Sequence, residues 1–277
     1  MYMVDIQKNS VSMLVLSCDA YSDLWDDFFN LRDKFWPDCE YKWYVVTESK
    51  SYDRKGVEVI KCGKELDWAG RLRYAVQTVA TPYIGFYLED FFINAPIDNN
   101  RIKELVAFMQ NKNVDYIDLG NVFHHKINQP NKKYFSDHLV IIDKHLRYGI
   151  DTAASLWERN YLLEKLGNDD YNAWKFEKDR CEEAASKEGI KGLLLVDDRL
   201  SFNVSEIPVV VQGKIYPPVK EDFRKRGYEI QSKRKVMSHW QRFKYDFKRW
   251  CGSIPFGHKT MKWVGSHIFG YKFFTED

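Results

Sequence analysis

YIGFYLEDFF, residues 83–92, is an almost unbroken apolar and aromatic run that meets two adjacent carboxylates, Glu89 and Asp90, before Phe91 and Phe92. A run with so little polar alternation predicts a strand that is buried on both faces, as in a parallel sheet. A buried carboxylate costs free energy unless a partner compensates its charge. The two acids therefore indicate either a strand that surfaces into a polar turn or a site for a cation or a polar ligand.

Segments on both sides of this run alternate between strand-like and helix-like patterns. Strands are expected at 12–18, 41–48, 57–62 and 114–121, and helices at 23–35, 67–80 and 99–112. Asp67 stands where a helix N-cap is expected. Strands that alternate with helices of about 10 to 15 residues predict an α/β domain, with a mainly parallel sheet sandwiched by helices.

The second half of the chain is less regular. A strand is expected within 138–146, amphipathic helices at 152–167 and 173–189, and short strands at 192–196 and 207–216. No repeat or low-complexity linker divides the sequence. We therefore expect one domain over residues 1–230, followed by a helical extension over 231–277.

The composition is that of a globular protein. The chain has 277 residues, of which 44% are apolar and 16% aromatic, and this is enough for one large core. Five scattered cysteines without a CxxC pair argue against a disulfide framework or a zinc site and favour a reducing, cytoplasmic location. No stretch approaches about 18 consecutive apolar residues, so no membrane-spanning helix is expected.

The formal net charge of +2 hides an uneven distribution. Residues 233–277 hold ten Lys and Arg against three acidic residues, a net +7, which leaves −5 for residues 1–232. Four apolar side chains of this tail recur at helical spacing: Val236, Trp240, Phe243 and Phe247. Such a basic amphipathic helix can lie in the interface of an anionic membrane, here the inner face of the cell membrane. The alternative is a terminal helix that packs on the body or on another subunit.

Polar side chains follow three of the expected strands. Ser17 and Asp19 follow the first, Thr47 and Glu48 follow the second, and Glu89 and Asp90 follow the fourth. In an open parallel sheet, ligands bind outside the carboxyl ends of the strands. Carboxylates there suit a hard divalent cation such as Mg²⁺ or Mn²⁺, which prefers oxygen ligands. The three strand ends together indicate a binding site at this rim.

The order of three strands, an arginine-bearing helix (WAGRLRYA, 68–75) and an apolar strand ending in acids resembles the GT-A nucleotide-sugar glycosyltransferases. Five segments are further similar to those of a group of bacterial capsular and cell-surface polysaccharide transferases: LSCDAYSDLW (16–25), WPDC (36–39), LEDFF (88–92), LWERNYLLEKL (156–166) and AWKFE (173–177). The resemblance covers roughly residues 12–230 and does not extend into the tail.

This resemblance implies a hexosyltransferase that moves a sugar from a nucleotide-sugar donor to a surface polysaccharide or lipid-linked glycan. It also implies a donor half over about 1–125 and an acceptor half over about 126–230. The residues at matching donor-binding positions are Ser17, Asp19, Thr47, Asp67, Arg71, Glu89 and Asp90.

In that family a DxD-type motif holds a divalent cation and the donor diphosphate. Here the motif reads Glu89-Asp90-Phe91-Phe92, so only Asp90 stands at a metal-ligand position. Arg71 would offer charge-assisted bonds to the leaving diphosphate, or else form an ion pair on the helix surface.

The acceptor side would need a carboxylate base near the acceptor hydroxyl if the transferase inverts the configuration of the sugar. Asp169, Asp170 and Glu177 are the candidates. We expect Asp170 as the base and Glu177 as an acceptor ligand, or the reverse; the alternatives are a helix cap for Asp170 and a solvated helix position for Glu177. Trp174 would stack on an acceptor sugar or belong to the core. His124, after the fifth strand, would reach the acceptor or be an ordinary surface or core histidine.

Two other functions compete with a transferase. A non-catalytic nucleotide-sugar or glycan-binding protein of the same fold would explain the imperfect DxD motif. A nucleic-acid binder would use the basic, aromatic tail, but the acidic body would repel phosphate backbones. No GxGxxG or GKS/T phosphate loop occurs in the sequence. We expect a nucleotide-sugar donor and a glycan or lipid-linked glycan acceptor as partners, and no nucleic acid.

Overall fold

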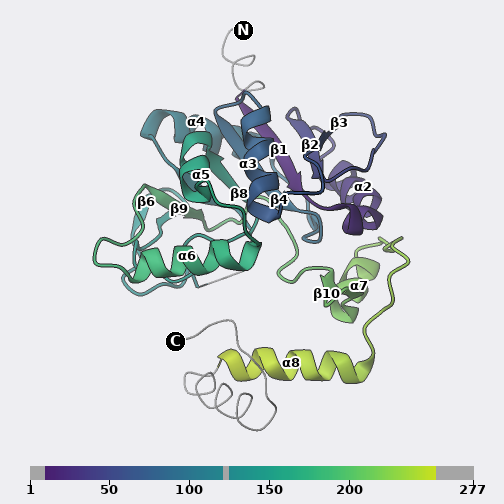
Figure 1. Cartoon of the computed structure of the whole chain (residues 1–277). Helices are drawn as coiled ribbons and strands as arrows, with labels where there is room; N and C mark the ends of the chain where they lie inside the picture. The colour runs from purple at the N-terminus through teal and green to yellow at the C-terminus, as the bar shows by residue number, and fades with distance from the viewer. Residues whose placement is uncertain (1–9, 121–124, 254–277) are drawn as a thin grey trace.

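A nine-stranded sheet forms the centre of the protein, as the computed structural model shows (Figure 1). The structure describes residues 10–120 and 125–253. The strand order is β3-β2-β1-β4-β8-β5-β9-β7-β6. The strands of this sheet are β1 (Val11–Leu16), β2 (Lys42–Thr47), β3 (Val57–Lys61), β4 (Tyr83–Leu88), β5 (Tyr116–Asp118), β6 (Tyr134–Ser136), β7 (Leu139–Ile141), β8 (Ser155–Glu158) and β9 (Leu194–Asp197).

Most strands of the sheet run in one direction. The pairs β1–β2, β2–β3, β1–β4 and β5–β9 are parallel, whereas β8 and β7 run against their neighbours. The expected α/β class with a mainly parallel sheet between helices is therefore confirmed.

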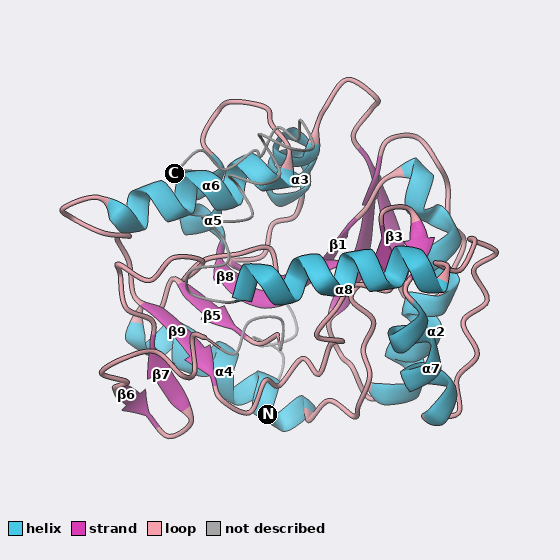
Figure 2. Ribbon diagram, turned by 90° about the horizontal axis from the view of Figure 1, so that it is seen from below, coloured by secondary structure: helices cyan, strands magenta, loops and turns pink. Residues whose placement is uncertain are grey.

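Helices cover both faces of the sheet (Figures 1 and 2). The helical elements are the 3-10 helix η1 (Asp19–Leu24), α2 (Trp25–Phe35), α3 (Trp68–Thr78), α4 (Asn99–Lys112), α5 (Arg159–Leu166), α6 (Ala173–Ala185), α7 (Pro217–Lys225) and α8 (His239–Ser253). Buried side chains of α2 and α4 join one apolar cluster, and those of α3, α5 and α6 join the other. The core thus consists of two layers, one on each side of the sheet.

Strand β1 shows why the sheet is buried on both faces. Met13 and Val15 point into one apolar cluster, and Leu14 and Leu16 point into the other, as the two-residue period of a strand requires. The neighbouring strand makes room for this packing at Gly85, where a Cβ atom would lie 2.1 Å from the sulfur of Met13. The glycine in YIGFYL is therefore a packing requirement.

Several predicted elements are confirmed close to their expected bounds. The helix expected at 99–112 is α4, and the strands expected at 41–48 and 57–62 are β2 and β3. Asp67 is the N-cap of α3, and its carboxylate accepts a hydrogen bond from the Trp68 N–H at 2.7 Å. This cap satisfies one of the N–H groups that begin the helix.

Three predictions about the bounds and type of elements are wrong. The run at 83–92 leaves the sheet after Leu88, so Glu89 and Asp90 lie in the turn. The first part of 152–167 is strand β8, which is inserted between β4 and β5, and only Arg159–Leu166 is helical. Residues 207–216 are a hairpin, β10 (Val210–Val211) and β11 (Lys214–Ile215), whose turn residues have positive φ. Short apolar segments do not distinguish strand from helix by their spacing.

The chain beyond residue 230 continues to pack on the body. The buried Asp27 of α2 accepts hydrogen bonds from the backbone N–H groups of Gln231 and Ser232 at 2.8 and 3.0 Å. Met237 is buried, and its N–H donates to the carbonyl of Ile215 in β11. A domain boundary at residue 230 stays a prediction, and the contacts across it continue into α8.

Helix α8 lies on the side of the molecule that the carboxyl ends of β1 to β4 face (Figures 1 and 2). Tyr216, at the start of α7, holds it there. The Tyr216 hydroxyl donates to the Asp246 carboxylate at 2.5 Å, and its ring meets that of Tyr245 edge-on at 5.5 Å. None of the described helices is both long and apolar enough to cross a membrane.

Candidate active site

The two central strands β1 and β4 bring the predicted strand ends together. The chain first extends the sheet from β1 to β2 and β3, then returns to place β4 on the other side of β1. Such a switch point is where open α/β sheets bind ligands, outside the carboxyl ends of the strands. Leu16 pairs with Leu88, so Ser17 and Glu89 leave the sheet next to each other.

Asp19 ties the loop after β1 to the loop after β2. Its carboxylate accepts hydrogen bonds from the Thr47 hydroxyl at 2.7 Å, the Ser49 hydroxyl at 2.5 Å and the N–H groups of Ser49 and Lys50 at 3.0 Å. Desolvation opposes ionisation, but these hydrogen bonds outweigh it and hold the pKa of Asp19 well below its usual range. Asp19 is therefore an ionised organiser of the two loops.

The hydroxyls of Ser17 and Thr47 are also engaged inside the protein. Both residues are buried, and the Ser17 hydroxyl accepts a hydrogen bond from the Trp25 indole at 2.8 Å. Thr47 uses its own proton for Asp19. Contacts from these two hydroxyls to a donor nucleoside stay predictions, whereas their part in shaping the loops is visible.

Glu48 connects the β1 loop to Arg71 of α3. One carboxylate oxygen accepts from the Asp19 N–H and the other from the Arg71 guanidinium at 3.2 Å. Arg71 also donates to the Leu66 carbonyl at 3.1 Å, and its buried Nε has no hydrogen-bond partner among the described residues. Arg71 therefore forms the ion pair that was the alternative for it, and its contact with a diphosphate stays a prediction.

Glu89 and Asp90 form a carboxylate pair that makes no ion pair of its own with the residues the structure describes. Glu89 is 7% exposed, and burial together with the Asp90 charge raises its pKa well above the usual range. Burial raises the pKa of Asp90 to about 7. The two arginines that act on the pair electrostatically, Arg71 and Arg234, form their ion pairs with Glu48 and Asp23 instead. A cation bound beside the pair would favour its ionised form.

A hard divalent cation fits this pair of carboxylates. Mg²⁺ and Mn²⁺ prefer carboxylate and phosphate oxygens and keep open positions for a ligand. No group of three or more His, Cys, Asp or Glu residues that could hold a metal exists within 10–120 and 125–253. Glu89 and Asp90 would thus be the protein's share of the ligands, with phosphate oxygens and water completing the shell.

The N-terminus of α3 is capped from another part of the chain. The Asp170 carboxylate accepts from the N–H groups of Asp67 and Gly70, both at 2.8 Å, and the Tyr171 carbonyl accepts from the Ala69 N–H at 2.9 Å. The Trp68 N–H donates to the Asp67 carboxylate, so the first N–H groups of α3 are all satisfied. This helix end has no free N–H left for a phosphate, and Asp170 has a structural role there.

Gly70 is expected to tolerate alanine only when Asp170 is absent. A Cβ atom at Gly70 would lie 2.7 Å from the Asp170 carboxylate. Displacing that cap costs about 1–2 kcal/mol, more than the helix gains from alanine, so Gly70→Ala should destabilise the protein. In an Asp170→Ala background the same change should stabilise it by about 0.5–1 kcal/mol. Urea unfolding of the four proteins measures both effects, and simple additivity would refute the contact.

Glu177 lies at the same edge of the sheet as the Glu89–Asp90 pair. Strand β8 runs against β4 and Ser155 pairs with Phe86, so the residues just before β8 lie beside the end of β4. Among them, Thr152 donates its hydroxyl proton to Glu177 at 2.8 Å. Burial and the neighbouring Asp151 raise the pKa of Glu177. Glu177 is a positioned, partly buried carboxylate whose basicity exceeds that of an ordinary glutamate.

A buried ion cluster holds Asp151, the residue before Thr152, in place. The Lys126 ammonium, which is fully buried, pairs with Asp118 at the end of β5 and with Asp151 at 2.7 Å. Asp151 in turn accepts from the Ala153 N–H at 2.9 Å. Two carboxylates and one ammonium leave a net negative charge near Glu177, which favours its protonated form.

The remaining acceptor-side predictions have mixed outcomes. Trp174, in the first turn of α6, is 79% exposed, so it is no core tryptophan and offers a free face. The neighbouring Phe176 packs on Trp68 of α3 at 5.4 Å, which fixes this end of α6. His124 lies outside the described residues. The roles of Trp174 and His124 toward an acceptor stay predictions.

Two contributors to this edge, Lys126 and Arg234, were not among the expected residues. Glu48 was expected at the end of β2, next to Thr47, but without a role in donor binding. Lys126 and Arg234 gave no such signal, because each stands in a polar stretch that reads as solvated surface. Both depend on contacts across more than one element.

No protein-family model matches the sequence, and no curated protein matches it. Solved structures do match it. TarS from S. aureus is 13% identical over a match that covers 68% of this chain and 35% of TarS, with a TM-score of 0.41. The match therefore spans about a third of the length of TarS.

Two other solved structures are matched over more of their length. The mannosyltransferase PcManGT from Pyrobaculum calidifontis, in complex with GDP-Man and Mn²⁺, is 11% identical; the match covers 95% of this chain and 81% of that chain, with a TM-score of 0.45. A UDP-glucose pyrophosphorylase complexed with UDP-glucose is 7% identical, with 67% and 89% covered and a TM-score of 0.41.

Proposed function

We propose that the protein is a glycosyltransferase of the hexosyltransferase class, which moves a sugar from a nucleotide-sugar donor to a surface polysaccharide or lipid-linked glycan. The observation that carries this proposal is the Glu89–Asp90 pair at the switch point of the sheet. Two adjacent carboxylates with raised pKa values, Glu89 buried and Asp90 half-buried, suit a cation-bound diphosphate better than any neutral ligand. The sequence resemblance to GT-A enzymes supports the same conclusion.

On the donor side, the nucleotide would lie over the β1 and β2 loops that Asp19 and Thr47 organise. Its diphosphate would lie at the ends of β1 and β4, where Arg71 is within reach of the rim through its link to Glu48. A divalent cation held by Glu89 and Asp90 would neutralise charge on the diphosphate when bound. Arg71 adds a fixed positive charge toward the leaving group.

On the acceptor side, we assign the base to Glu177 and a positioning role to Asp170. Both oxygens of Asp170 already accept N–H groups at the start of α3, whereas one oxygen of Glu177 accepts from Thr152 and the other accepts no hydrogen bond from the described residues. A base is most effective when its pKa approaches the working pH, and burial raises that of Glu177. Trp174 would stack on the acceptor sugar.

The transfer step follows from these roles. Glu177 accepts the proton of the acceptor hydroxyl while that oxygen forms a bond to the anomeric carbon of the donor sugar. The bond from the same carbon to the phosphate oxygen breaks, and its electron pair leaves on the diphosphate. The products are the extended glycan and a nucleoside diphosphate.

A panel of UDP-, GDP- and dTDP-sugars tests the proposal. The protein is incubated with each donor and a set of glycan acceptors, and release of nucleoside diphosphate is measured with and without Mg²⁺ or Mn²⁺. Transfer, or slow donor hydrolysis without an acceptor, is the expected result. Donor binding without either reaction would favour a non-catalytic nucleotide-sugar or glycan-binding protein.

The C-terminal helix α8 supports a further part of the proposal, peripheral contact with an anionic membrane. Its anchored side faces Tyr216, whereas three aromatic side chains point away: Trp240, Phe243 and Phe247 are 63%, 57% and 51% exposed. Their rings lie nearly parallel, at interplanar angles of 13° and 18°. Three exposed, stacked aromatics on one side of a helix form a compact apolar face.

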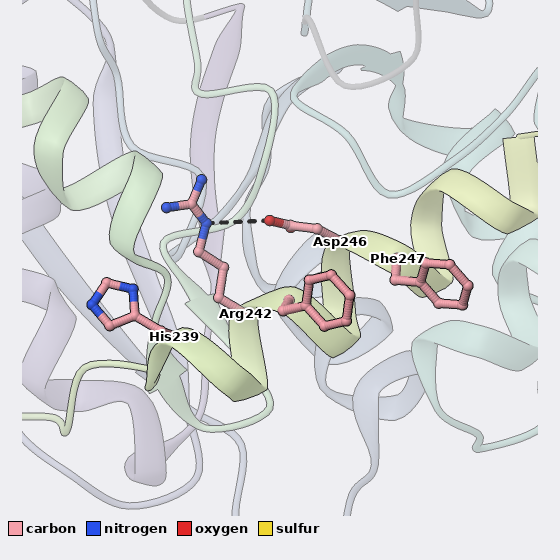
Figure 3. A pocket seen from close by; sticks show the side chains of 5 residues that line it. His239, Arg242, Asp246 and Phe247 are labelled. Atoms are coloured by element: carbon pink, nitrogen blue, oxygen red, sulfur yellow. Dashed lines mark hydrogen bonds and ion pairs between the residues drawn. The ribbon is translucent and has the colours of Figure 1, made fainter.

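The charges of α8 suit the same surface. Lys244 is exposed and its ammonium lies 5.1 Å from the centre of the Trp240 ring, while the acid Asp246 is engaged by Tyr216 and by Arg242 at 3.2 Å. A hollow of about 460 Å³ lies along α8 (Figure 3), and the side chains that line it are His239, Arg242, Phe243, Asp246 and Phe247. A basic, aromatic face attracts anionic headgroups and inserts apolar rings between them. A lipid-linked acceptor would be found at such a surface.

Replacing Trp240, Phe243 and Phe247 together by serine should release the full-length protein from anionic vesicles. Each ring contributes about 1 kcal/mol or more of apolar transfer, so partitioning should fall by about a hundredfold. Co-sedimentation with vesicles rich in phosphatidylserine, at low and high salt, measures the effect. Tyr74→Ser, which removes an exposed aromatic of α3, is the matched control. Unchanged sedimentation of the triple variant would refute the membrane contact.

A further inference from the structure

The segment that joins α7 to α8 is held at both ends against the body. On one side, Asp27 binds the N–H groups of Gln231 and Ser232. On the other, Ile215 of β11 binds the Lys235 carbonyl and the Met237 N–H, at 3.0 and 2.9 Å. Arg234 lies between these two anchors, so the backbone fixes its position.

Of the three consecutive basic residues in this segment, only Arg234 turns inward. Lys233 and Lys235 are exposed, whereas the Arg234 side chain is 16% exposed. Its guanidinium lies 4.3 Å over the ring of Tyr21 and donates to the Ala20 carbonyl at 2.5 Å. These contacts are all on η1, which begins at Asp19 directly after the first strand end.

Arg234 also lies beside the backbone that holds Asp90. The Asp90 carbonyl accepts from the Val209 N–H at 2.7 Å, and the Val209 carbonyl accepts from the Tyr216 N–H at 2.8 Å. Tyr216 follows Ile215, the residue that anchors the Arg234 segment. Backbone hydrogen bonds thus connect the C-terminal segment, through the β10–β11 hairpin, to the end of β4.

One nitrogen of the Arg234 guanidinium donates no hydrogen bond to the described residues. Nε and Nη2 donate to the Asp23 carboxylate at 2.7–3.1 Å, while Nη1 has no hydrogen-bond partner among residues 10–120 and 125–253. The rim of the site carries four carboxylates, those of Asp19, Glu48, Glu89 and Asp90. A diphosphate brought to such a rim needs positive charge beyond Arg71.

We propose that Arg234 binds a phosphate oxygen of the donor's nucleoside diphosphate, so that the segment after α7 completes the donor site. This inference rests on the proposed function and deepens it. Arginine suits the role because Nε and Nη2 hold Asp23 and the Ala20 carbonyl, which leaves Nη1 for an anion. Stacking on Tyr21 keeps the guanidinium plane fixed while the ligand enters.

A purely structural role for Arg234 makes a different prediction. If Arg234 only clamps the C-terminal segment to η1 through Asp23, then removing either partner should have the same consequence. If Arg234 binds the nucleotide, Asp23 matters only for stability. Arg234→Gln and Asp23→Asn break the same ion pair in the full-length protein, so their melting temperatures should fall alike, and nucleotide affinity separates the two roles.

Isothermal titration of UDP, GDP and dTDP into the full-length protein with Mg²⁺ measures that affinity. Arg234→Gln should weaken binding by about ten- to a hundredfold, the loss of one charge-assisted hydrogen bond. Asp23→Asn should change it by less than about fivefold. Arg234→Lys keeps the positive charge but loses the planar guanidinium, so its nucleotide affinity should lie between that of Arg234→Gln and that of the unaltered protein. Arg224→Gln removes an exposed arginine paired with Glu221 and should leave affinity unchanged.

Two outcomes overturn the inference alone: Arg234→Gln binds nucleotide as the unaltered protein does, or Asp23→Asn weakens binding as much as Arg234→Gln. Should Arg234→Gln fail to fold, Arg234→Lys decides. Full nucleotide affinity in Arg234→Lys would refute a phosphate contact, and so would a complete loss of affinity in both Arg234→Lys and Asp23→Asn. If the unaltered protein bound none of the three nucleotides, the proposed function would fall and this inference with it.

Discussion

Asp90→Asn is expected to lower the rate of sugar transfer by about 10²–10³-fold, the effect of removing several kcal/mol of charge stabilisation from the transition state. Asp90 stands at the switch point of the sheet, and it is the residue that matches a metal-ligand position. Asparagine keeps the size of the side chain but cannot balance a divalent cation. Steady-state transfer with saturating donor and Mg²⁺ or Mn²⁺ measures the loss.

Glu89→Gln is the matched neighbour and should lose less activity, because Glu89 does not match the DxD pattern. Melting temperatures should separate catalysis from folding. Burial raises the pKa of Asp90, so its charge opposes folding, and Asp90→Asn should melt at the same temperature as the unaltered protein or higher. Normal transfer by Asp90→Asn, or a fall in its melting temperature that accounts for the lost activity, would remove Asp90 from the site.

The pH dependence of stability gives a check that needs no substrate. The folded-state pKa of Asp90 is about 7 against an ordinary value of 3.8, so the folded protein keeps a proton that the unfolded chain releases first. The contribution of Asp90 to the free energy of unfolding is therefore most favourable below pH 3.8 and is lost as the pH rises through about 7. Added Mg²⁺ or Mn²⁺ should restore stability at neutral pH. That gain should vanish in Asp90→Asn.

The general fold could be predicted because the sequence repeats a strong local signal. YIGFYL and SMLVLS are continuous apolar strands, and the helices between them have clear caps, such as Asp67. The place of the site followed from the same strands, since parallel strands end at one edge. Ser17, Glu89 and Asp90 could therefore be placed together before any contact between them was known.

Long-range features could not be predicted in this way. Strand β8 has the same apolar spacing as the helix that follows it, and only pairing with both β4 and β5 makes it a strand. Asp170 looks like a cap for its own helix, yet it caps α3, from 100 residues away in sequence. Arg234 stands in a run of basic residues whose local pattern does not indicate which one turns inward. Each case depends on a contact between distant segments, which local periodicity does not encode.

Glu177→Gln is expected to lower the transfer rate by about 10²–10⁴-fold, the usual contribution of a general base, with donor affinity retained. Burial and Asp151 raise the pKa of Glu177, and only the carboxylate form accepts a proton. The rate should therefore fall as the pH decreases through a value above the ordinary 4.5 of glutamate. Thr152→Val removes a hydrogen bond that stabilises the carboxylate, so it should shift this acid limb to higher pH.

Asp170→Asn is the comparison that separates a base from a cap. Asparagine keeps one carbonyl oxygen for the α3 N–H groups, so Asp170→Asn should lose about 1 kcal/mol of stability and, once folded, transfer sugar at a rate near that of the unaltered protein. A large loss of rate in Asp170→Asn with full activity in Glu177→Gln would exchange the two roles. Equal, mild losses in both would mean that neither carboxylate is the base, because a true base cannot be replaced by an amide that accepts no proton at neutral pH.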